Sequence, residues 1–213
     1  MLKAHIFDFD GTLVDSMPTW IEKVLNILRT CKIDYTDDLL PHIVTLGDAG
    51  TARYFQEVLG VPLSLDEMFA MMDEYALPRY SNLVPVKEGV REYLEYLRSQ
   101  GCSLNVLTAS PHKMLDPCLK RLGIYDWFDN VWSCDDFGTT KSNPDIYLQA
   151  AARIGSAPEE TVFYDDSLAA IRTAKQAGLP TVGIYDEYAA AFLSDMQREC
   201  GKFAFQMTEL IEE

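Results

Sequence analysis

Two aspartates, Asp8 and Asp10, lie two positions apart at the end of the first apolar segment, Lys3 to Phe9, and Gly11 and Thr12 follow them. In a β-strand this spacing places both side chains on one face. Paired carboxylates at the end of an apolar strand are suited to holding a cation or transferring protons. Taken alone, the segment also allows a simpler interpretation, in which one aspartate forms a turn with Gly11.

A second acidic pair, Asp165 and Asp166, closes another apolar segment that begins at Thr161. Ligand sites of parallel sheets lie outside the carboxyl ends of the strands, so we expect the two pairs to meet at one edge. Two like charges about 4 Å apart repel by about 4 kcal/mol at an effective dielectric constant of about 20. A divalent cation or protonation must relieve this repulsion. Oxygen ligands without thiolate or imidazole favour Mg²⁺ over zinc, and we predict Mg²⁺ as the cofactor.

Three further residues complete a possible reaction site. Thr108 and Ala109 close an apolar segment just before Pro111, and a hydroxyl with backbone N–H groups at a helix start binds anionic oxygens well. Lys141 lies in a polar loop ahead of another helical pattern. Taken singly, a helix cap and a solvated lysine are the ordinary interpretations. Together, a cation, a lysine and a hydroxyl around a carboxylate are typical of phosphoryl transfer, because negative charge on the transferring group must be neutralised.

The periodicity of the chain indicates the scaffold that positions these residues. Short apolar segments, typical of strands, alternate with helical patterns in which apolar residues recur every three or four positions, as at Val90, Tyr93, Leu94 and Leu97. This alternation predicts the α/β class, with a Rossmann-like parallel sheet and helices on both faces. The expected strands are residues 3–9, 103–108, 130–133, 161–165 and 181–184.

Helix signals mark the other elements. Asn143, followed by a proline, is the expected cap of a helix that runs to about Ile154, and Ser167 is the expected cap of a helix that ends at Gly178. Residues 17–82 contain several helical stretches and no convincing strand. We therefore predict an α/β core domain of residues 1–16 and 83–213, with an all-helical cap domain of residues 17–82 inserted into it.

Four motifs in this order resemble those of the haloacid dehalogenase superfamily. They are DFDGT at Asp8 to Thr12, the hydrophobic strand that ends in LTAS at Thr108, Lys141 ahead of NPD, and YDDS at Asp165 and Asp166. The chain resembles the helical-cap branch of that superfamily, the phosphoglycolate phosphatase and β-phosphoglucomutase-like enzymes, over residues 3 to 186. One such motif is only suggestive, but four in order at strand ends are specific.

The resemblance implies a role for each motif residue. Asp8 is expected to be the nucleophile that takes the phosphoryl group as an aspartyl phosphate. Asp10 is expected to protonate the leaving group and activate water, while its carbonyl helps hold Mg²⁺. The implied roles of the other residues are phosphate binding by Thr108, Ala109 and Lys141, neutralisation of Asp8 by Lys141, and metal binding by Asp8, Asp10, Asp166 and Asp165, the last directly or through water.

Two departures bear on the reaction class. Dehalogenating members lack an acid at the position of Asp10, so phosphate hydrolysis is favoured over dehalogenation. The sugar-phosphate mutases of this branch carry a histidine about a dozen residues after the nucleophile, where this chain has Trp20. We therefore expect a Mg²⁺-dependent phosphatase for a small-molecule phosphate monoester, such as a sugar phosphate, phosphoglycolate or a nucleotide-like ester. The alternatives are a sugar-phosphate mutase and a non-enzymatic phospho-acceptor or phosphate-binding module.

Composition limits the partners. The 213 residues are 48% hydrophobic, and 33 acidic against 18 basic side chains give a net charge of −15, which repels nucleic acids and anionic membranes. Five widely separated cysteines form no CxxC pair, and the chain has neither a signal-peptide pattern nor a membrane-spanning apolar run. We expect a cytoplasmic enzyme whose partner is a small phosphate ester. Arg53 is a candidate contact for an anionic substrate tail, or else an ordinary helix-surface arginine, and the oligomeric state is not readable.

Overall fold

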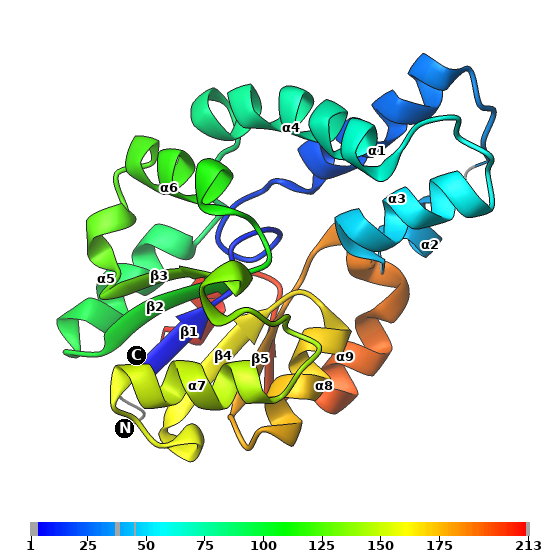
Figure 1. The fold of residues 1–213 in the computed structure, drawn as a ribbon. Coiled ribbons are helices and arrows are strands. Elements are labelled where there is room, and N and C mark those ends of the chain that lie inside the picture. The colour runs from blue at the N-terminus through cyan, green and yellow to red at the C-terminus, as the bar shows by residue number, and fades with distance from the viewer. Residues whose placement is uncertain (1–3, 37–38, 45, 212–213) are drawn as a thin grey trace. The chain divides into compact units, whose positions relative to one another are not determined.

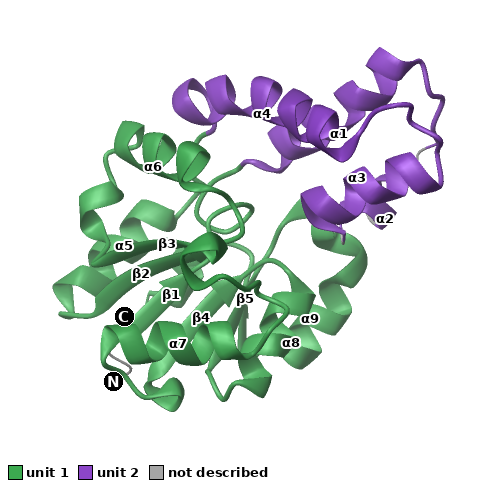
Figure 2. Ribbon diagram, viewed as in Figure 1, with its two compact units in different colours: residues 1–15, 85–213 green, residues 16–84 purple. Residues whose placement is uncertain are grey.

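The computed structural model describes residues 4–36, 39–44 and 46–211. The chain divides into two compact units, coloured separately in Figure 2. We call residues 1–15 with 85–213 the core unit, and residues 16–84 the helical unit.

The core unit is built on a parallel sheet of six strands in the order β3-β2-β1-β4-β5-β6 (Figure 1). The first strand is central, with Phe7 in register with Val106 on one side and Tyr164 on the other. The strands are β1 (Ala4–Phe7), β2 (Ser103–Thr108), β3 (Asn130–Ser133), β4 (Thr161–Asp165), β5 (Thr181–Ile184) and β6 (Lys202–Ala204). The predicted fold class is therefore confirmed, although β6 was not expected.

Helices cover both faces of this sheet, as Figure 1 shows. Ile6 and Phe163 belong to an apolar cluster with residues of α7 (Asp145–Ile154), α8 (Leu168–Gln176) and α9 (Leu193–Glu199). The next residues, Phe7 and Tyr164, stack on each other, and both contact the ring of Tyr93 on α5 (Val90–Ser99). Successive strand residues thus pack on opposite faces, as β geometry requires.

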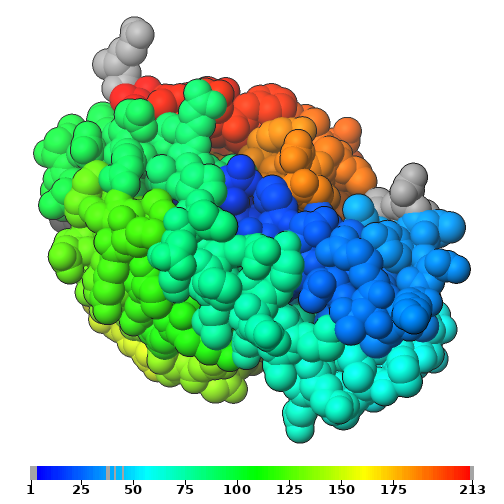
Figure 3. Space-filling view, turned by 90° about the horizontal axis from the view of Figure 1, so that it is seen from above, coloured from blue at the N-terminus to red at the C-terminus, as the bar shows by residue number. Residues whose placement is uncertain are grey.

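One further helix and five 3-10 helices complete the described part of the core unit. After β2 comes α6 (His112–Arg121), and the 3-10 helices are η1 (Tyr125–Trp127), η2 (Cys134–Phe137), η3 (Pro158–Glu160), η4 (Glu187–Phe192) and η5 (Met207–Leu210). The last of these packs beside α5, where the backbone of Thr208 comes close to Gly89. In the space-filling view of Figure 3, the C-terminal part of the chain, in red, lies directly beside part of the green surface.

The two expected helix caps differ in detail from the prediction. Asn143 Oδ1 does accept a hydrogen bond from the backbone N–H of Asp145, at 3.1 Å, although the helix begins one residue later than expected. Ser167 occupies the N-cap position of α8, but its side chain makes no capping bond. Its backbone N–H donates instead to Asp165 Oδ1 at 2.7 Å, so the start of α8 orients an acidic side chain.

The helical unit contains four helices in its described part, and no strand. They are α1 (Met17–Cys31), α2 (Leu39–Val44), α3 (Gly47–Glu57) and α4 (Leu65–Asn82). A capping box begins α4, because Ser64 accepts from the Glu67 N–H while the Glu67 carboxylate accepts from the Ser64 N–H. The core of this unit is apolar and includes the fully buried side chains of Val24, Phe55 and Met68. That this unit acts as a cap remains a prediction.

Across the described residues, no helix is both long enough and apolar enough to span a bilayer. None of the five cysteines, all of which are described, forms a disulfide.

Candidate functional site

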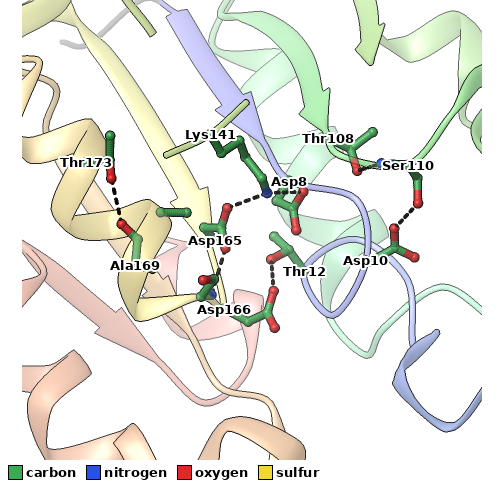
Figure 4. A network of polar contacts seen from close by, with 12 residues as sticks. Asp8, Asp10, Thr12, Thr108, Ser110, Lys141, Asp165, Asp166, Ala169 and Thr173 are labelled. Atoms are coloured by element: carbon green, nitrogen blue, oxygen red, sulfur yellow. Dashed lines mark hydrogen bonds and ion pairs between the residues drawn. The ribbon is translucent and has the colours of Figure 1, made fainter. Parts of the chain in front are cut away.

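The carboxyl ends of β1, β2 and β4 bring most of the predicted site residues to one edge of the sheet (Figure 4). Asp8 follows β1 directly, Thr108 is the last residue of β2, and Asp165 is the last residue of β4. The Asp8 N–H donates to the Tyr164 carbonyl at 2.9 Å, which extends the β1–β4 pairing by one residue and places Asp8 next to Asp165. Parallel pairing is thus what aligns the two carboxylates.

Lys141 joins these two carboxylates. Its Nζ lies 2.6 Å from Asp8 Oδ1 and 2.8 Å from Asp165 Oδ2, and its side chain is 15% exposed. The contact with Asp165 is also a hydrogen bond, whereas the contact with Asp8 is an ion pair without hydrogen-bond geometry. Burial alone lowers the pKa of this ammonium, but Asp165 and Asp8 outweigh that effect and hold the pKa well above its ordinary value. Lys141 therefore stays charged.

Asp166 adds a third carboxylate to the cluster. One oxygen of each of Asp8, Asp165 and Asp166 lies within 4.8 Å of the others. Burial is the largest cause that raises the pKa of Asp8, to about 7; Lys141 opposes this shift, and Asp165 and Asp10 add to it. Burial, followed by the charges of Asp165 and Asp8, also raises the pKa of Asp166. If all three carboxylates were ionised, they would carry more negative charge than one ammonium neutralises.

This donor set fits a hard divalent cation. Apart from its ion pair with Lys141, the buried Asp8 Oδ1 has no hydrogen-bond donor among the described residues. The grouped ligand atoms are all carboxylate oxygens, the donors that Mg²⁺ prefers. Asp8, Asp165 and Asp166 are therefore the side chains able to hold the predicted ion. Coordination by the Asp10 carbonyl stays a prediction.

The turn after β1 explains why glycine follows Asp10. Gly11 has φ +74°, and a Cβ at this position would lie 2.5 Å from Asp166 Oδ2. Any other side chain would displace that carboxylate. The next residue, Thr12, donates from Oγ1 to Asp166 Oδ1 at 3.0 Å. The turn therefore both makes room for Asp166 and orients it.

We expected Asp8 and Asp10 to lie on one face of a strand. Asp10 instead lies within this turn, so that expectation was wrong. The strand β1 ends at Phe7, and Leu13 and Val14 both donate backbone N–H groups to the Phe9 carbonyl. The Asp10 carboxylate accepts a hydrogen bond from Ser110 Oγ, and Figure 4 places this pair apart from Asp165 and Asp166. Asp8 thus has the carboxylates of Asp165 and Asp166 on one side and Asp10 on the other.

Thr108 and Ala109 lie at the end of β2 near this pair. The Thr108 hydroxyl is buried and accepts a hydrogen bond from the Ser110 N–H at 3.0 Å, and Ala109 is exposed. Arg53 is exposed on α3 of the helical unit, and its contact with a substrate stays a prediction. The contacts of Thr12, Ser110 and Lys87 were not predicted from the sequence. Thr12 and Ser110 stood inside recognised motifs, but Lys87 carried no such signal.

Comparison with known proteins decides the family. The family described as haloacid dehalogenase-like hydrolase matches residues 5–184. The chain belongs to this family. A phosphorylated carbohydrates phosphatase of Thermotoga maritima is 29% identical over 181 residues, which are 85% of this chain and 84% of the relative. Hexitol phosphatase B of Escherichia coli K12 is also 29% identical, over 84% of this chain and 82% of its own length.

Solved structures agree on the fold of this haloacid dehalogenase-like chain. A β-phosphoglucomutase from Clostridium difficile superposes with a TM-score of 0.81 at 19% identity, covering 99% of this chain and 94% of that one. The predicted family membership is therefore confirmed, and so is the prediction that the chain is a phosphoric monoester hydrolase.

Proposed function

We propose that this chain is a Mg²⁺-dependent phosphatase that hydrolyses a small phosphate monoester through an aspartyl phosphate on Asp8. One observation carries the proposal: Lys141 contacts the carboxylates of both Asp8 and Asp165, while Asp166 lies in the same cluster. Carboxylates with a purely structural role need not gather around one lysine at the open edge of a sheet. A nucleophilic carboxylate that must approach an anionic phosphate does need it.

The first half-reaction transfers the phosphoryl group to the enzyme. An oxygen of Asp8 attacks phosphorus, and the bond from phosphorus to the ester oxygen breaks. Lys141 reduces the repulsion between Asp8 and the phosphate, because its charge lies 2.6 Å from the nucleophilic carboxyl group. The leaving alkoxide takes a proton from Asp10. The Thr108 hydroxyl and the Ala109 N–H are assigned to the phosphoryl oxygens.

The second half-reaction restores the enzyme. Asp10 takes a proton from water, the water oxygen attacks phosphorus, and the bond from phosphorus to Asp8 breaks to release phosphate. Ser110 supports both steps, because its hydroxyl donates to the Asp10 carboxylate and orients it. Asp10 returns to its protonated form, ready for the next ester.

The metal would be held by Asp8 and Asp166, with Asp165 bound directly or through water. When bound, Mg²⁺ supplies charge neutralisation and orientation of the transferring phosphoryl group. Asp165 is already engaged, because Lys141 and the Ser167 N–H each donate to one of its oxygens. Its role is therefore assigned partly to holding Lys141 in place.

The names of two relatives support a proposal for the substrate class. One is named a phosphorylated carbohydrates phosphatase and the other a hexitol phosphatase. We propose a sugar or polyol phosphate as the class to test first. The helical unit, including Arg53, is assigned to substrate selection, because it contributes none of the clustered carboxylates described above.

The test compares wild type and Asp8→Asn on a panel of phosphate esters, with and without Mg²⁺. Asp8→Asn should abolish phosphate release, whereas the control Asp126→Asn, at an exposed position of η1, should retain it. Full activity of the Asp8→Asn protein would exclude the mechanism. Product NMR separates hydrolysis from a mutase reaction, because a mutase interconverts sugar phosphates and releases little free phosphate.

A further inference from the structure

A second, partly buried ammonium, that of Lys87, lies near the cluster and outside the proposed ligand set. Its Nζ donates to the Gly11 carbonyl at 2.6 Å, to the Tyr185 carbonyl at 2.7 Å and to Asp186 Oδ2 at 3.1 Å. A lysine has three donors, so each ammonium proton has an acceptor. The side chain is 18% exposed and Asp186 is buried. Lys87 therefore joins the turn after β1 to the loop after β5.

The backbone of Lys87 is fixed to the same turn. Its N–H donates to the Leu13 carbonyl at 3.0 Å, and the neighbouring residue Val86 forms an antiparallel bridge with Val14. The position of the ammonium is thus set from both ends. A lysine held in this way acts as a fixed charge and not as a mobile surface group.

The peptide that Lys87 holds is the one that packs on Asp166. Gly11 offers its carbonyl to Lys87, while the hydrogen side of its Cα faces Asp166 so closely that a Cβ would clash. The next side chain, Thr12, donates to Asp166. A shift of this peptide would move the Gly11 backbone that Asp166 packs against. It would also move the Thr12 hydroxyl that donates to Asp166.

The charges around the cluster also support a role for Lys87 at this site. Asp8, Asp165 and Asp166 form the cluster, and Asp186 brings a fourth carboxylate near Asp166. Lys141 is engaged with Asp8 and Asp165 on one side. Lys87, paired with Asp186, places a second positive charge at the other end of the cluster.

We propose that Lys87 is a positioning residue for the metal site: it orients Asp166 through the Gly11–Thr12 turn and thereby sets the affinity for the divalent cation. It does not contact the substrate. This inference rests on the proposed function, because it assigns Lys87 to the metal site of that reaction.

The test measures metal binding directly. Mn²⁺ serves as the probe, titrated into the full-length, metal-free protein and followed by EPR, with Mg²⁺ activation measured in parallel. Lys87→Met should weaken Mn²⁺ binding and raise the Mg²⁺ concentration for half-maximal activity by about tenfold or more, the usual effect of losing an outer-sphere partner. At saturating Mg²⁺ the substrate KM should change by less than about twofold. Lys87→Arg, which keeps the charge and donors, should recover most of the affinity.

Lys175→Met is the matched control, since Lys175 also donates to a backbone carbonyl, that of Glu199, at the surface of the core unit. It should bind Mn²⁺ as the wild type does. Equal Mn²⁺ affinity in Lys87→Met and wild type would overturn the inference. If Lys87→Met does not fold, as judged by circular dichroism, Lys87→Gln decides in the same way. A wild type without Mn²⁺ binding or Mg²⁺-dependent activity would instead refute the proposed function.

Discussion

The ammonium of Lys141 lies between two carboxylates, 2.6 Å from Asp8 Oδ1 and 2.8 Å from Asp165 Oδ2. Asp165 is fully buried and receives a second hydrogen bond from Ser167, so it holds the lysine at a defined place. The lysine in turn faces the proposed nucleophile. Asp165 thus acts on Asp8 through Lys141.

Removing this charge tests that relationship. Lys141→Met should lower kcat by about 100- to 1,000-fold, the usual effect of losing one group that stabilises charge in the transition state. Asp165→Asn should lower kcat less, because Lys141 keeps its contact with Asp8. Steady-state kinetics at saturating Mg²⁺ provides the measurement. A Lys141→Met enzyme with wild-type kcat would show that this contact has no part in the reaction.

The raised pKa of Asp8 predicts how stability depends on pH. The folded carboxyl group has a pKa of about 7, above its ordinary value of 3.8, so between these values the folded state binds more protons than the unfolded state. In the metal-free protein, the contribution of this group is therefore lost as pH rises through 7. Asp8→Asn removes the buried charge and should stabilise the metal-free protein at about pH 8, by up to about 4 kcal/mol.

Thermal unfolding of metal-free wild type and Asp8→Asn, at about pH 5 and about pH 8, checks this sign. The two Tm values should differ most at the higher pH. Addition of Mg²⁺ at that pH should raise the Tm of the wild type more than that of the variant. The reason is that the cation would neutralise the ionised Asp8 carboxylate, which the variant lacks. A variant that is less stable than wild type at the higher pH would contradict the prediction.

Much of this site was predictable from the sequence for a physical reason. Aspartates that end short apolar segments must meet when those segments pair in parallel, and Asp8 and Asp165 do meet. The contact of Lys141 with Asp8 was expected only from the family resemblance, and its contact with Asp165 was not predicted, because a loop of seven residues allows many positions. No sequence motif marks Lys87, which lies between Val86 and Glu88. One of its acceptors, the Tyr185 carbonyl, is 98 positions away in the chain.

The same limit applies to two structural details. Strand β6 has three residues, of which only Ala204 is buried, so no apolar period marks it. Ser167 was expected to cap its helix through its side chain, but its backbone N–H binds Asp165 instead. Local patterns predict where an element begins, whereas the partner of each polar group depends on the tertiary structure.

His112 provides a second pH-dependent contact, outside the proposed reaction. Its two ring nitrogens lie 2.8 Å from carboxylate oxygens of Asp116 and Asp136, and these hydrogen bonds raise its pKa above the ordinary value. Because the pKa is raised in the folded state, the stabilisation is complete below the unfolded pKa of about 6.5 and is lost as pH rises through the folded value. His112→Gln should therefore lower Tm at about pH 6 and have less effect at about pH 9. NMR titration of the His112 ring measures the pKa itself, and a value below that of a model peptide would contradict this prediction.

Gly11 offers the sharpest test of the turn, because the chain supplies a control with the same backbone conformation. Gly11 and Gly101 both have φ +74°, but a Cβ at Gly11 would lie 2.5 Å from Asp166 Oδ2, whereas a Cβ at Gly101 would meet nothing within 4 Å. Both alanine variants should lose about 1 kcal/mol of unfolding free energy to the left-handed conformation. Only Gly11→Ala should also displace Asp166, so it should weaken Mg²⁺ activation by about tenfold or more. Chemical denaturation and Mg²⁺ titration of the two variants separate backbone strain from displacement of the carboxylate, and equal Mg²⁺ dependence in both would show that Asp166 tolerates the added methyl group.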